Sequence, residues 1–260
     1  MAYVNTYAPP TLDMTSPIVL PDPNEPYDLN FCFPVKPLET DRIKIVPFIP
    51  RIHAKAVYAA IIQYPQVMHF MPWPDVSSQR EFEELVEVRG RREPGFCLFV
   101  TLSKDGLTKS DEEDPDKIAK FLLGTIAYCN ASRDLSTVEI GFIIILPPYQ
   151  RTHVSSHAIG LLMKYALDMP KDGGLGVRRV QWQAHASNQA SVRAGMRLGF
   201  KMEGVIKWQR PLPAGKESSA PYREDDSLGL PGRHSAMLAV CWDDWENGGR
   251  ELVRGLMERK

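Results

Sequence analysis

The clearest pattern of hydrophobic and polar positions runs from residue 137 to residue 166. Apolar side chains dominate residues 138–145, apart from Glu139 and one glycine, which predicts a largely buried β-strand that carries a single carboxylate. Two consecutive prolines end this strand, because proline cannot donate a hydrogen bond to a neighbouring strand. Apolar residues then recur at helical spacing from about Thr152 or His153. The segment is therefore expected to form a strand, a polar turn and a helix.

Similar patterns predict that the rest of the chain is a mixed α/β (α+β) domain. Strands are expected over residues 40–48, 95–102, 118–128, 177–186, 200–209 and 234–242. Helices are expected over residues 50–64, from Ser77 or Ser78, from Ser187 or Asn188 to residue 198, and at the C-terminus. Glu81 completes a capping-box pattern at the start of the second helix. In chain order these are one strand, two helices, a β meander and then β-α-β-α-β-β. This order is typical of a mixed sheet with helices packed against it.

Proline density sets residues 1–39 apart from the domain. This stretch holds eight prolines, which exclude helix interiors and remove N–H donors that a sheet needs. We expect an extended arm, either draped over the domain or disordered, followed by one domain over residues 40–260. Residues 103–117 and 211–233 are interrupted by glycine and proline and are expected to be loops.

Composition narrows the classes of protein to which the chain can belong. Of the 260 residues 43% are hydrophobic and 24% are charged, which is enough apolar material for a full core. The 31 basic and 32 acidic residues nearly cancel, so bulk charge does not indicate a nucleic-acid partner. No apolar run reaches membrane-spanning length, and the N-terminus lacks a signal or transit pattern. With four widely spaced cysteines, we expect reduced thiols and a cytoplasmic protein without a membrane partner.

Two stretches carry a resemblance to a known family. EIGFIIILPPYQRTHVSSHA (residues 139–158) and NQASVRAGMRLGFKMEGVIKWQR (residues 188–210) resemble the GNAT superfamily of acyl-CoA-dependent N-acyltransferases. The chain is most similar to the branch that includes the ribosomal-protein alanine N-acetyltransferases, over about residues 40–245. The resemblance implies the GNAT fold, a twisted, mostly antiparallel sheet of about seven strands with helices on both faces. It also implies acetyl transfer from acetyl-CoA to a small-molecule amine or a protein N-terminus, by a monomer or homodimer.

The resemblance places the phosphates of CoA at the turn before the helix. The family signature there is Gln or Arg, two residues, Gly, one residue, then Gly or Ala; this chain has Gln150, His153 and Ser155 at those positions. Backbone N–H groups at a helix N-terminus bind phosphate whatever the side chains are. The expected phosphate contacts are therefore Gln150, Arg151, Thr152, His153, Val154 and Ser155. His153 either points away from the turn or adds a hydrogen bond of its own.

The remaining cofactor contacts are also implied by the resemblance. The pantetheine arm is expected to pair with the backbone near Ile143 and Ile145, as a substitute strand. Asn188 is expected to form a hydrogen bond with the pantetheine. Since Asn is a favoured N-cap, Asn188 has a capping interpretation as well.

Two residues are predicted to carry the chemistry, which the resemblance implies is direct transfer without a covalent enzyme intermediate. The attacking amine must lose a proton, and Glu139 is the candidate base because apolar neighbours raise the pKa of a carboxyl group. Ser191 resembles the serine that donates to the departing thiolate, whose free pKa is about 8.5. The alternatives are an ion pair between Glu139 and a basic residue on a neighbouring strand, and a helix-capping role for Ser191.

The acceptor side is predicted from aromatic and histidine side chains. Phe70 and Trp73 are expected at the acceptor entrance by family analogy, or else as core or lid packing. Trp182 and His185 alternate on one strand, so that one of them should face the acceptor channel. His153 and His157 have metal-ligand spacing, but no third ligand is apparent and no metal is expected. The rival function is a non-catalytic acyl-CoA-binding module that has kept the fold.

Overall fold

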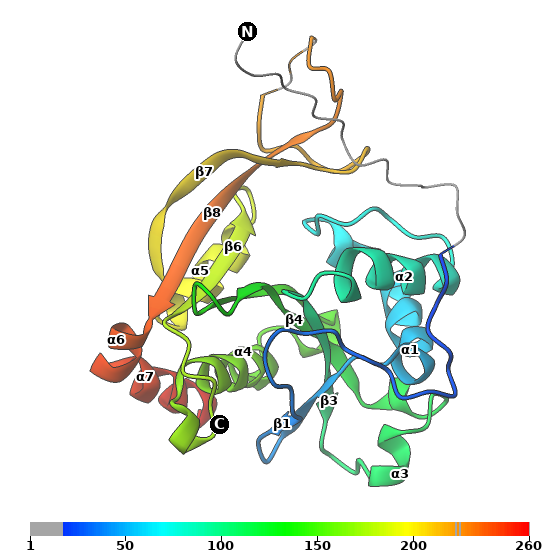
Figure 1. The fold of residues 1–260 in the computed structure, drawn as a ribbon, viewed down its shortest axis with the longest axis vertical. Coiled ribbons are helices and arrows are strands. Elements are labelled where there is room, and N and C mark those ends of the chain that lie inside the picture. Colours follow the sequence, from blue (N-terminus) through cyan, green and yellow to red (C-terminus); the bar gives the residue numbers. More distant parts are fainter. Residues whose placement is uncertain (1–17, 222, 224, 260) are drawn as a thin grey trace, which may run out of the picture.

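Eight strands form one sheet in the computed structural model, which describes residues 18–221, 223 and 225–259 (Figure 1). In chain order they are β1 (Leu38–Glu39), β2 (Ile43–Pro47), β3 (Cys97–Ser103), β4 (Leu122–Ser132), β5 (Thr137–Ile145), β6 (Arg179–His185), β7 (Lys201–Pro211) and β8 (Gly232–Cys241). Their spatial order is β1-β2-β3-β4-β5-β6-β8-β7, and every neighbouring pair is antiparallel except β5 and β6. The predicted mixed, mostly antiparallel sheet is confirmed, with β1 as an additional edge strand.

Helices cover both faces of the sheet, as predicted. They are α1 (Pro50–Gln63), α2 (Gln79–Val86), α3 (Lys109–Glu112), α4 (His153–Leu167), α5 (Gln189–Arg197), α6 (Trp242–Asp244) and α7 (Arg250–Met257). Side chains of α1 and α2 form one core with β3 and β4, while α4, α5 and α7 form the other with β4, β5, β6 and β8. The longest helix, α4, has 15 residues, and no helix in the described ranges has the length and apolar character needed to cross a bilayer.

The parallel pair β5 and β6 separates soon after it starts. The two strands pair only from Thr137↔Arg179 to Glu139↔Gln181, so beyond Glu139 the β6-facing edge of β5 has no strand beside it. A bulge bends the same part of β5, because the register with β4 shifts and Phe142 has a φ of 50°. The sheet therefore opens at its centre, with β6, β7 and β8 on one side and β4 on the other (Figure 1).

The described part of the N-terminal arm is draped over the domain, which was one of the two expectations. Phe31 stacks on Tyr128 with ring centroids 6.0 Å apart, and the Cys32 N–H donates to the Pro94 carbonyl over 2.8 Å. Leu38–Glu39, which the sequence placed within the arm, pairs with β2. Residues 1–17 of the predicted arm lie outside the described residues.

Three local predictions need correction. Residues 103–117 are not all loop, because Thr108 caps the short helix α3 through a capping box with Asp111. The strand expected from residue 118 begins at Leu122, after a 3₁₀ turn. The predicted capping box of α2 is shared between two serines: Ser78 Oγ accepts from the Glu81 N–H over 3.1 Å, while the Glu81 carboxylate accepts from the Ser77 N–H over 2.8 Å.

Asp168, at the C-terminal end of α4, holds the C-terminal helices against the domain. Its buried carboxylate accepts from Trp245 Nε1 over 2.8 Å and from Arg250 Nε over 3.0 Å, and it also pairs with Lys164. Burial opposes ionisation of Asp168, but these three partners outweigh it and lower the pKa of the carboxyl group. The interaction therefore stabilises the fold while Asp168 is ionised.

Replacing Asp168 by Asn should lower the free energy of unfolding at pH 7 by about 2–3 kcal/mol, because charge-assisted hydrogen bonds are lost. The difference in unfolding free energy between wild type and variant should shrink as the pH falls below about 4. The wild-type Asp168 then becomes protonated and is uncharged, like the Asn of the variant. Urea unfolding measures both effects, and Asp172→Asn at an exposed position is the matched control. Equal stability of wild type and Asp168→Asn at pH 7 would contradict this account.

Candidate active site

A cavity of about 600 Å³ lies where β5 and β6 separate. Seven of the predicted site residues line it: Phe70, Trp73, Glu139, Ile143, His185, Asn188 and Ser191. Ile145 and the turn from Gln150 to Ser155 are not among its lining residues, because they lie at and beyond the end of β5. The structure thus brings the predicted catalytic and acceptor residues together and places the predicted phosphate turn farther along the same strand.

Glu139 is a buried carboxyl group whose side-chain partners are Asn130 and Cys129. It is 5% exposed, and Oε2 accepts from Asn130 Nδ2 over 2.9 Å. Burial raises the pKa of Glu139, and this effect outweighs the lowering by Asn130 and by the nearby positive charges of Arg210 and Arg233. Within the described residues no Lys or Arg forms an ion pair with Glu139, so the ion-pair alternative is not what the structure shows. A carboxyl group with a raised pKa is suited to proton transfer near neutral pH.

Ser191 lies in the first turn of α5. Trp182 Nε1 donates to Ser191 Oγ over 3.1 Å, so the serine oxygen already accepts one hydrogen bond. The serine hydroxyl proton has no acceptor among the described residues, which leaves it available to a group in the cavity. Asn188 is the N-cap of α5, since Oδ1 accepts from the Ser191 N–H over 3.1 Å. The capping interpretation therefore holds for Asn188.

The predicted acceptor residues form walls of the cavity. Trp73 packs on Phe142 at the bulge, with ring centroids 4.8 Å apart, and Phe70 lies 5.2 Å from the His185 ring. His185 Nδ1 accepts from the Ser187 N–H over 3.2 Å, and Nε2 lies 3.1 Å from the Glu217 carbonyl. Burial lowers the pKa of His185, which favours a neutral ring with the proton on Nε2. Both Trp182 and His185 line the cavity, although only one was expected to.

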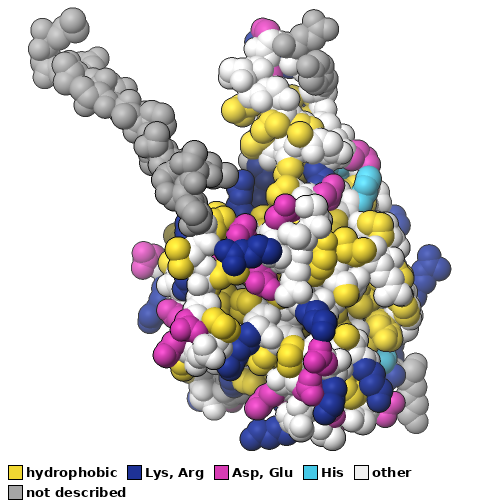
Figure 2. Space-filling model, turned by 90° about the vertical axis from the view of Figure 1, so that its right-hand side faces the viewer, with side chains coloured by type: hydrophobic (Ala, Val, Ile, Leu, Met, Phe, Trp, Pro, Cys, Tyr) yellow, Lys and Arg dark blue, Asp and Glu magenta, His cyan; other side chains and the backbone are white. Residues whose placement is uncertain are grey.

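The loop between β7 and β8 reaches across to the segment before α2. Lys216 Nζ donates to the Met68 carbonyl over 3.1 Å and pairs with Asp75. Glu217 pairs with His69 over 2.7 Å. These contacts hold the loop beside His185 and Phe70, two of the predicted acceptor residues. In the space-filling view, Lys or Arg side chains lie in the hollow below this projecting end of the molecule (Figure 2).

The turn from Gln150 to Ser155 has the form of an anion-binding site. Gln150 Nε2 donates to the Ile145 carbonyl over 3.0 Å, and Arg151 has a φ of 61°. Thr152 caps α4 through its Oγ, which accepts from the Val154 N–H over 3.3 Å. In the described residues the N–H groups of Arg151, Thr152 and His153 have no acceptor. These free donors at the start of a 15-residue helix fit a phosphate group.

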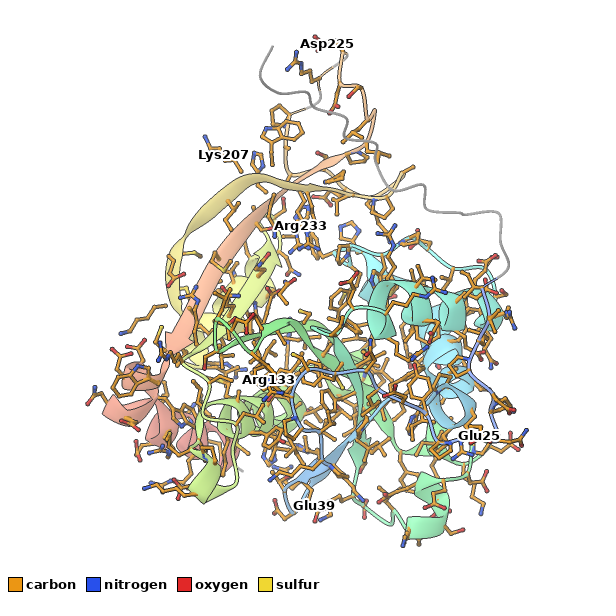
Figure 3. The ribbon with its side chains drawn as sticks, in the orientation of Figure 1. Glu25, Glu39, Arg133, Lys207, Asp225 and Arg233 are labelled. Atoms are coloured by element: carbon orange, nitrogen blue, oxygen red, sulfur yellow. The ribbon has the colours of Figure 1, made fainter. Side chains whose placement is uncertain are left out.

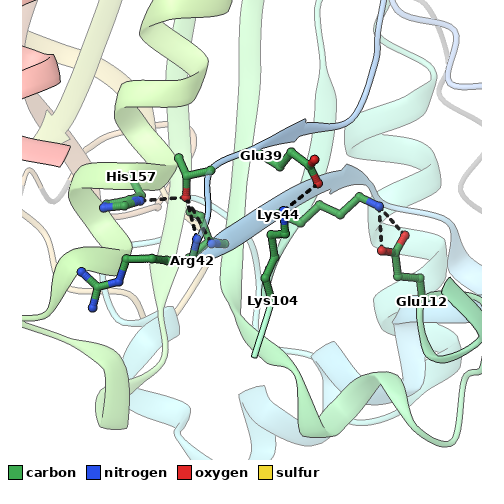
Figure 4. Close-up of polar contacts among 8 residues, drawn as sticks. Glu39, Arg42, Lys44, Lys104, Glu112 and His157 are labelled. Carbon is green, nitrogen blue, oxygen red and sulfur yellow. Dashed lines mark hydrogen bonds and ion pairs between the residues drawn. The ribbon is translucent and has the colours of Figure 1, made fainter. Parts of the chain in front are cut away.

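His153 packs along its own helix. Its ring lies 5.2 Å from the His157 ring, and His157 Nδ1 is 2.9 Å from Thr40 Oγ1 (Figure 4). Thr40 Oγ1 also accepts from the Arg42 N–H, so the histidine pair joins α4 to the turn between β1 and β2.

The one group of His, Cys, Asp or Glu side chains close enough together to hold a metal ion in the described ranges is Cys241, Asp243 and Asp244. This group lies outside the cavity.

Several polar residues of the cavity could not be singled out from the sequence, and three of them, Asn130, Arg210 and Arg233, lie near Glu139. Asn130 is a partner of Glu139, and Arg210 and Arg233 face each other on β7 and β8. Asn130 and Arg233 lie outside the two stretches that carry the family resemblance, and Arg210 is only the last residue of the second one. The arrangement of the strands in the sheet brings these residues to the cavity that contains Glu139. Spacing along the chain does not reveal which strands are neighbours.

Comparison with known proteins agrees with this geometry. Residues 42–201 match the family described as Acetyltransferase (GNAT) domain. The chain therefore belongs to the GNAT acetyltransferase family, which confirms the predicted family and enzyme class. It is 31% identical over 88 residues to YoaA of Bacillus subtilis (strain 168), an uncharacterized N-acetyltransferase. That match covers 34% of this chain and 46% of YoaA, so it spans less than half of that relative.

Solved structures share the fold at low sequence identity. A GCN5-related N-acetyltransferase from Brucella melitensis has a TM-score of 0.65 at 20% identity, covering 85% of this chain and 84% of that one. RimL, a ribosomal L7/L12 α-N-protein acetyltransferase, has a TM-score of 0.57 at 14% identity, with 79% and 94% covered. Mycobacterium smegmatis RimJ in complex with CoA-disulfide has a TM-score of 0.59 at 12% identity, with 85% and 92% covered. The structural neighbours thus include the predicted branch.

Replacing Asn130 by Gly should raise the pKa of Glu139, because the hydrogen bond from Asn130 stabilises the ionised carboxylate. Glycine is the suitable replacement, since residue 130 has a φ of 47°. Carbon-13 NMR of labelled glutamate side chains, followed through a pH titration, measures the shift, and Glu139→Gln assigns the signal. An unchanged or lowered pKa in Asn130→Gly would show that the bond does not stabilise the charge.

Proposed function

We propose that this chain transfers an acetyl group from acetyl-CoA to a primary amine, with Glu139 as the general base and Ser191 as the donor to the departing thiolate. The observation that carries the proposal is that one cavity, at the separation of β5 and β6, is lined by both Glu139 and Ser191. The two side chains come from strand β5 and helix α5, so a thioester and an amine have room to meet between them.

The donor fits the uncovered edge of β5 and the turn that follows it. Backbone groups near Ile143 and Ile145 have no β6 partner, so this edge of β5 is open to the amides of pantetheine, apart from the Ile145 carbonyl, which accepts from Gln150 Nε2. The free N–H groups of Arg151, Thr152 and His153, with the side chains of Gln150 and Ser155 nearby in sequence, suit the phosphates. Asn188 retains an amide NH₂ group for the pantetheine while its oxygen caps α5.

The reaction that these residues support is direct acyl transfer. The neutral amine attacks the thioester carbonyl carbon, a C–N bond forms and the C–S bond breaks. Glu139 takes the proton that the amine nitrogen loses, directly or through a water molecule. Ser191 donates a hydrogen bond to the sulfur as it becomes a thiolate, and Trp182 holds the serine oxygen in place. A backbone N–H on the bulged strand β5 is the candidate donor to the carbonyl oxygen.

The acceptor class and the cellular location are part of the proposal. The proposed base lies inside a cavity, so the acceptor amine has to enter that cavity. A small molecule or a protein N-terminus with a primary amine can do so. All four cysteines are free thiols in the structure, which supports the predicted cytoplasmic location.

Replacing Glu139 by Gln should lower kcat by about 10²–10⁴-fold, because the variant has no base, and leave the Kd for acetyl-CoA nearly unchanged. Ser191→Ala should lower kcat by about tenfold, as expected for loss of one hydrogen bond in the transition state. Steady-state kinetics on a panel of amines, with calorimetry for binding, measure both. Glu246→Gln, at an exposed position, is the control. Unchanged kcat in Glu139→Gln would reject Glu139 as base, and binding without turnover in wild type would favour the non-catalytic module.

Changes at His153 test the phosphate turn. His153→Ala should bind acetyl-CoA about as well as wild type, because the main chain supplies the donors. His153→Glu should bind it about tenfold more weakly, since a negative charge then lies at the helix N-terminus beside the phosphates. Isothermal titration calorimetry at fixed ionic strength measures both variants. Equal weakening in the two variants would mean that the imidazole itself holds the donor.

A further inference from the structure

The cavity holds a buried positive charge whose role the acyl-transfer chemistry does not explain. Arg233, on β8, is 5% exposed, and its Nε has no hydrogen-bond partner among the described residues. It forms no ion pair with any carboxylate in residues 18–221, 223 and 225–259. Figure 3 shows Arg233 on the inner side of β8, toward β4 and α2. A guanidinium N–H that is buried without an acceptor costs free energy, which indicates that a bound molecule supplies the acceptor.

A second arginine points at the same space. Arg210 is half-buried and lies directly opposite Arg233 in the β7–β8 register. Its one hydrogen bond to a described residue runs from Nε to Gln209 Oε1 over 3.3 Å, so its terminal nitrogens are free. Both arginines line the cavity that also contains Glu139. The two guanidinium groups repel each other, so an anion between them would relieve that repulsion.

The acidic groups of the cavity do not neutralise this pair. Glu139 is more than 4.0 Å from either guanidinium, and its charge is committed to the amine in the proposed reaction. Glu93 also lines the cavity, but it is exposed, as is Arg89. The deep part of the cavity thus has an excess of positive charge.

We propose that Arg210 and Arg233 form an anion subsite for the acceptor, so that the preferred substrate is an amine that also carries a carboxylate. The inference rests on the proposed acetyl transfer. A planar guanidinium pairs with a carboxylate through two parallel hydrogen bonds, and two guanidinium groups on adjacent strands offer such a fork to one small anion. The phosphates of the donor are assigned to the other end of β5, so they do not fill this place.

Two kinds of acceptor share this chemistry. A free α-amino acid carries the carboxylate one carbon from the amine, whereas a peptide that begins with Asp or Glu carries it on the first side chain. The cavity volume of about 600 Å³ holds either an amino acid or the first residue of a peptide. Separate arms of one experiment distinguish these sources.

The experiment measures kcat/KM for matched pairs of acceptors. One arm compares α-amino acids with their α-amides, and the other compares peptide amides beginning with Asp or Glu with their Asn or Gln counterparts. In wild type, the carboxylate member of at least one arm should be preferred by about tenfold or more. Arg233→Gln and Arg210→Gln should each reduce that preference to less than about threefold, mainly through KM. Because both arginines lower the pKa of Glu139, the variants are compared on the high-pH plateau of the rate, where the uncharged acceptor should change little.

Controls separate the subsite from folding and from the donor site. Lys207→Gln, which removes a charge from the outer side of β7 (Figure 3), should keep the full preference. Arg233→Gln should not lower the Tm and should keep the wild-type Kd for acetyl-CoA, because Arg233 Nε has no described partner to lose. Arg233→Lys should keep part of the preference, since it retains the charge without the planar fork.

The same inference has a readout that needs no turnover. With CoA present, calorimetry should show N-acetyl-alanine or N-acetyl-Asp-Ala-Ala-amide binding more tightly than its uncharged counterpart, and Arg233→Gln should abolish the difference. Turnover of amines without preference for the carboxylate member would overturn the subsite while acetyl transfer stands. No turnover of any amine would instead reject the proposed function, and the binding arm would still decide the subsite. Equal loss of both members in Arg233→Gln would also overturn it.

Discussion

The short parallel pairing between β5 and β6 is the constraint on which the site depends. The two strands share only three register positions, yet β5 continues beside β4 to Ile145 and β6 continues beside β8 to His185. Each strand is thus fixed by its other neighbour, and the sheet must open between them. Backbone N–H and C=O groups on the uncovered edge of β5 need partners, and an extended molecule with amides of its own can supply them.

The opening also explains the electrostatics of the cavity. Glu139 lies where the pairing ends, so its carboxyl group is buried by both halves of the sheet. Its polar side-chain partners come from β4 alone, and burial still raises its pKa. Arg233 experiences the opposite effect, because burial and the neighbouring Arg210 lower its pKa to about 10. Both shifts reflect charged groups removed from water without a full set of partners. The fold tolerates the cost of such groups because contacts elsewhere stabilise it. One example is the Asp168 carboxylate, which joins α4 to the C-terminal helices.

Local signals in the sequence were sufficient for much of this account. The strand, turn and helix of residues 137–166 could be predicted because apolar periodicity, prolines and a cap lie within one short stretch. Glu139 was conspicuous as a lone carboxylate in a buried strand. The roles of Arg210 and Arg233 could not be predicted, because they depend on which strands pair and in what register. The edge strand β1 gives no sequence signal of this kind, because only two residues form it, within a proline-rich stretch.

Amide hydrogen exchange with and without acetyl-CoA tests the central claim most directly, because it reports which backbone groups the donor covers. The account predicts slower exchange on binding at Ile143 and Ile145 and at residues 151–155, with little change at residues 137–139, which already pair with β6. Protection confined to another part of the molecule, such as the groove between α4 and α7, would contradict the claim that the uncovered edge of β5 holds the donor.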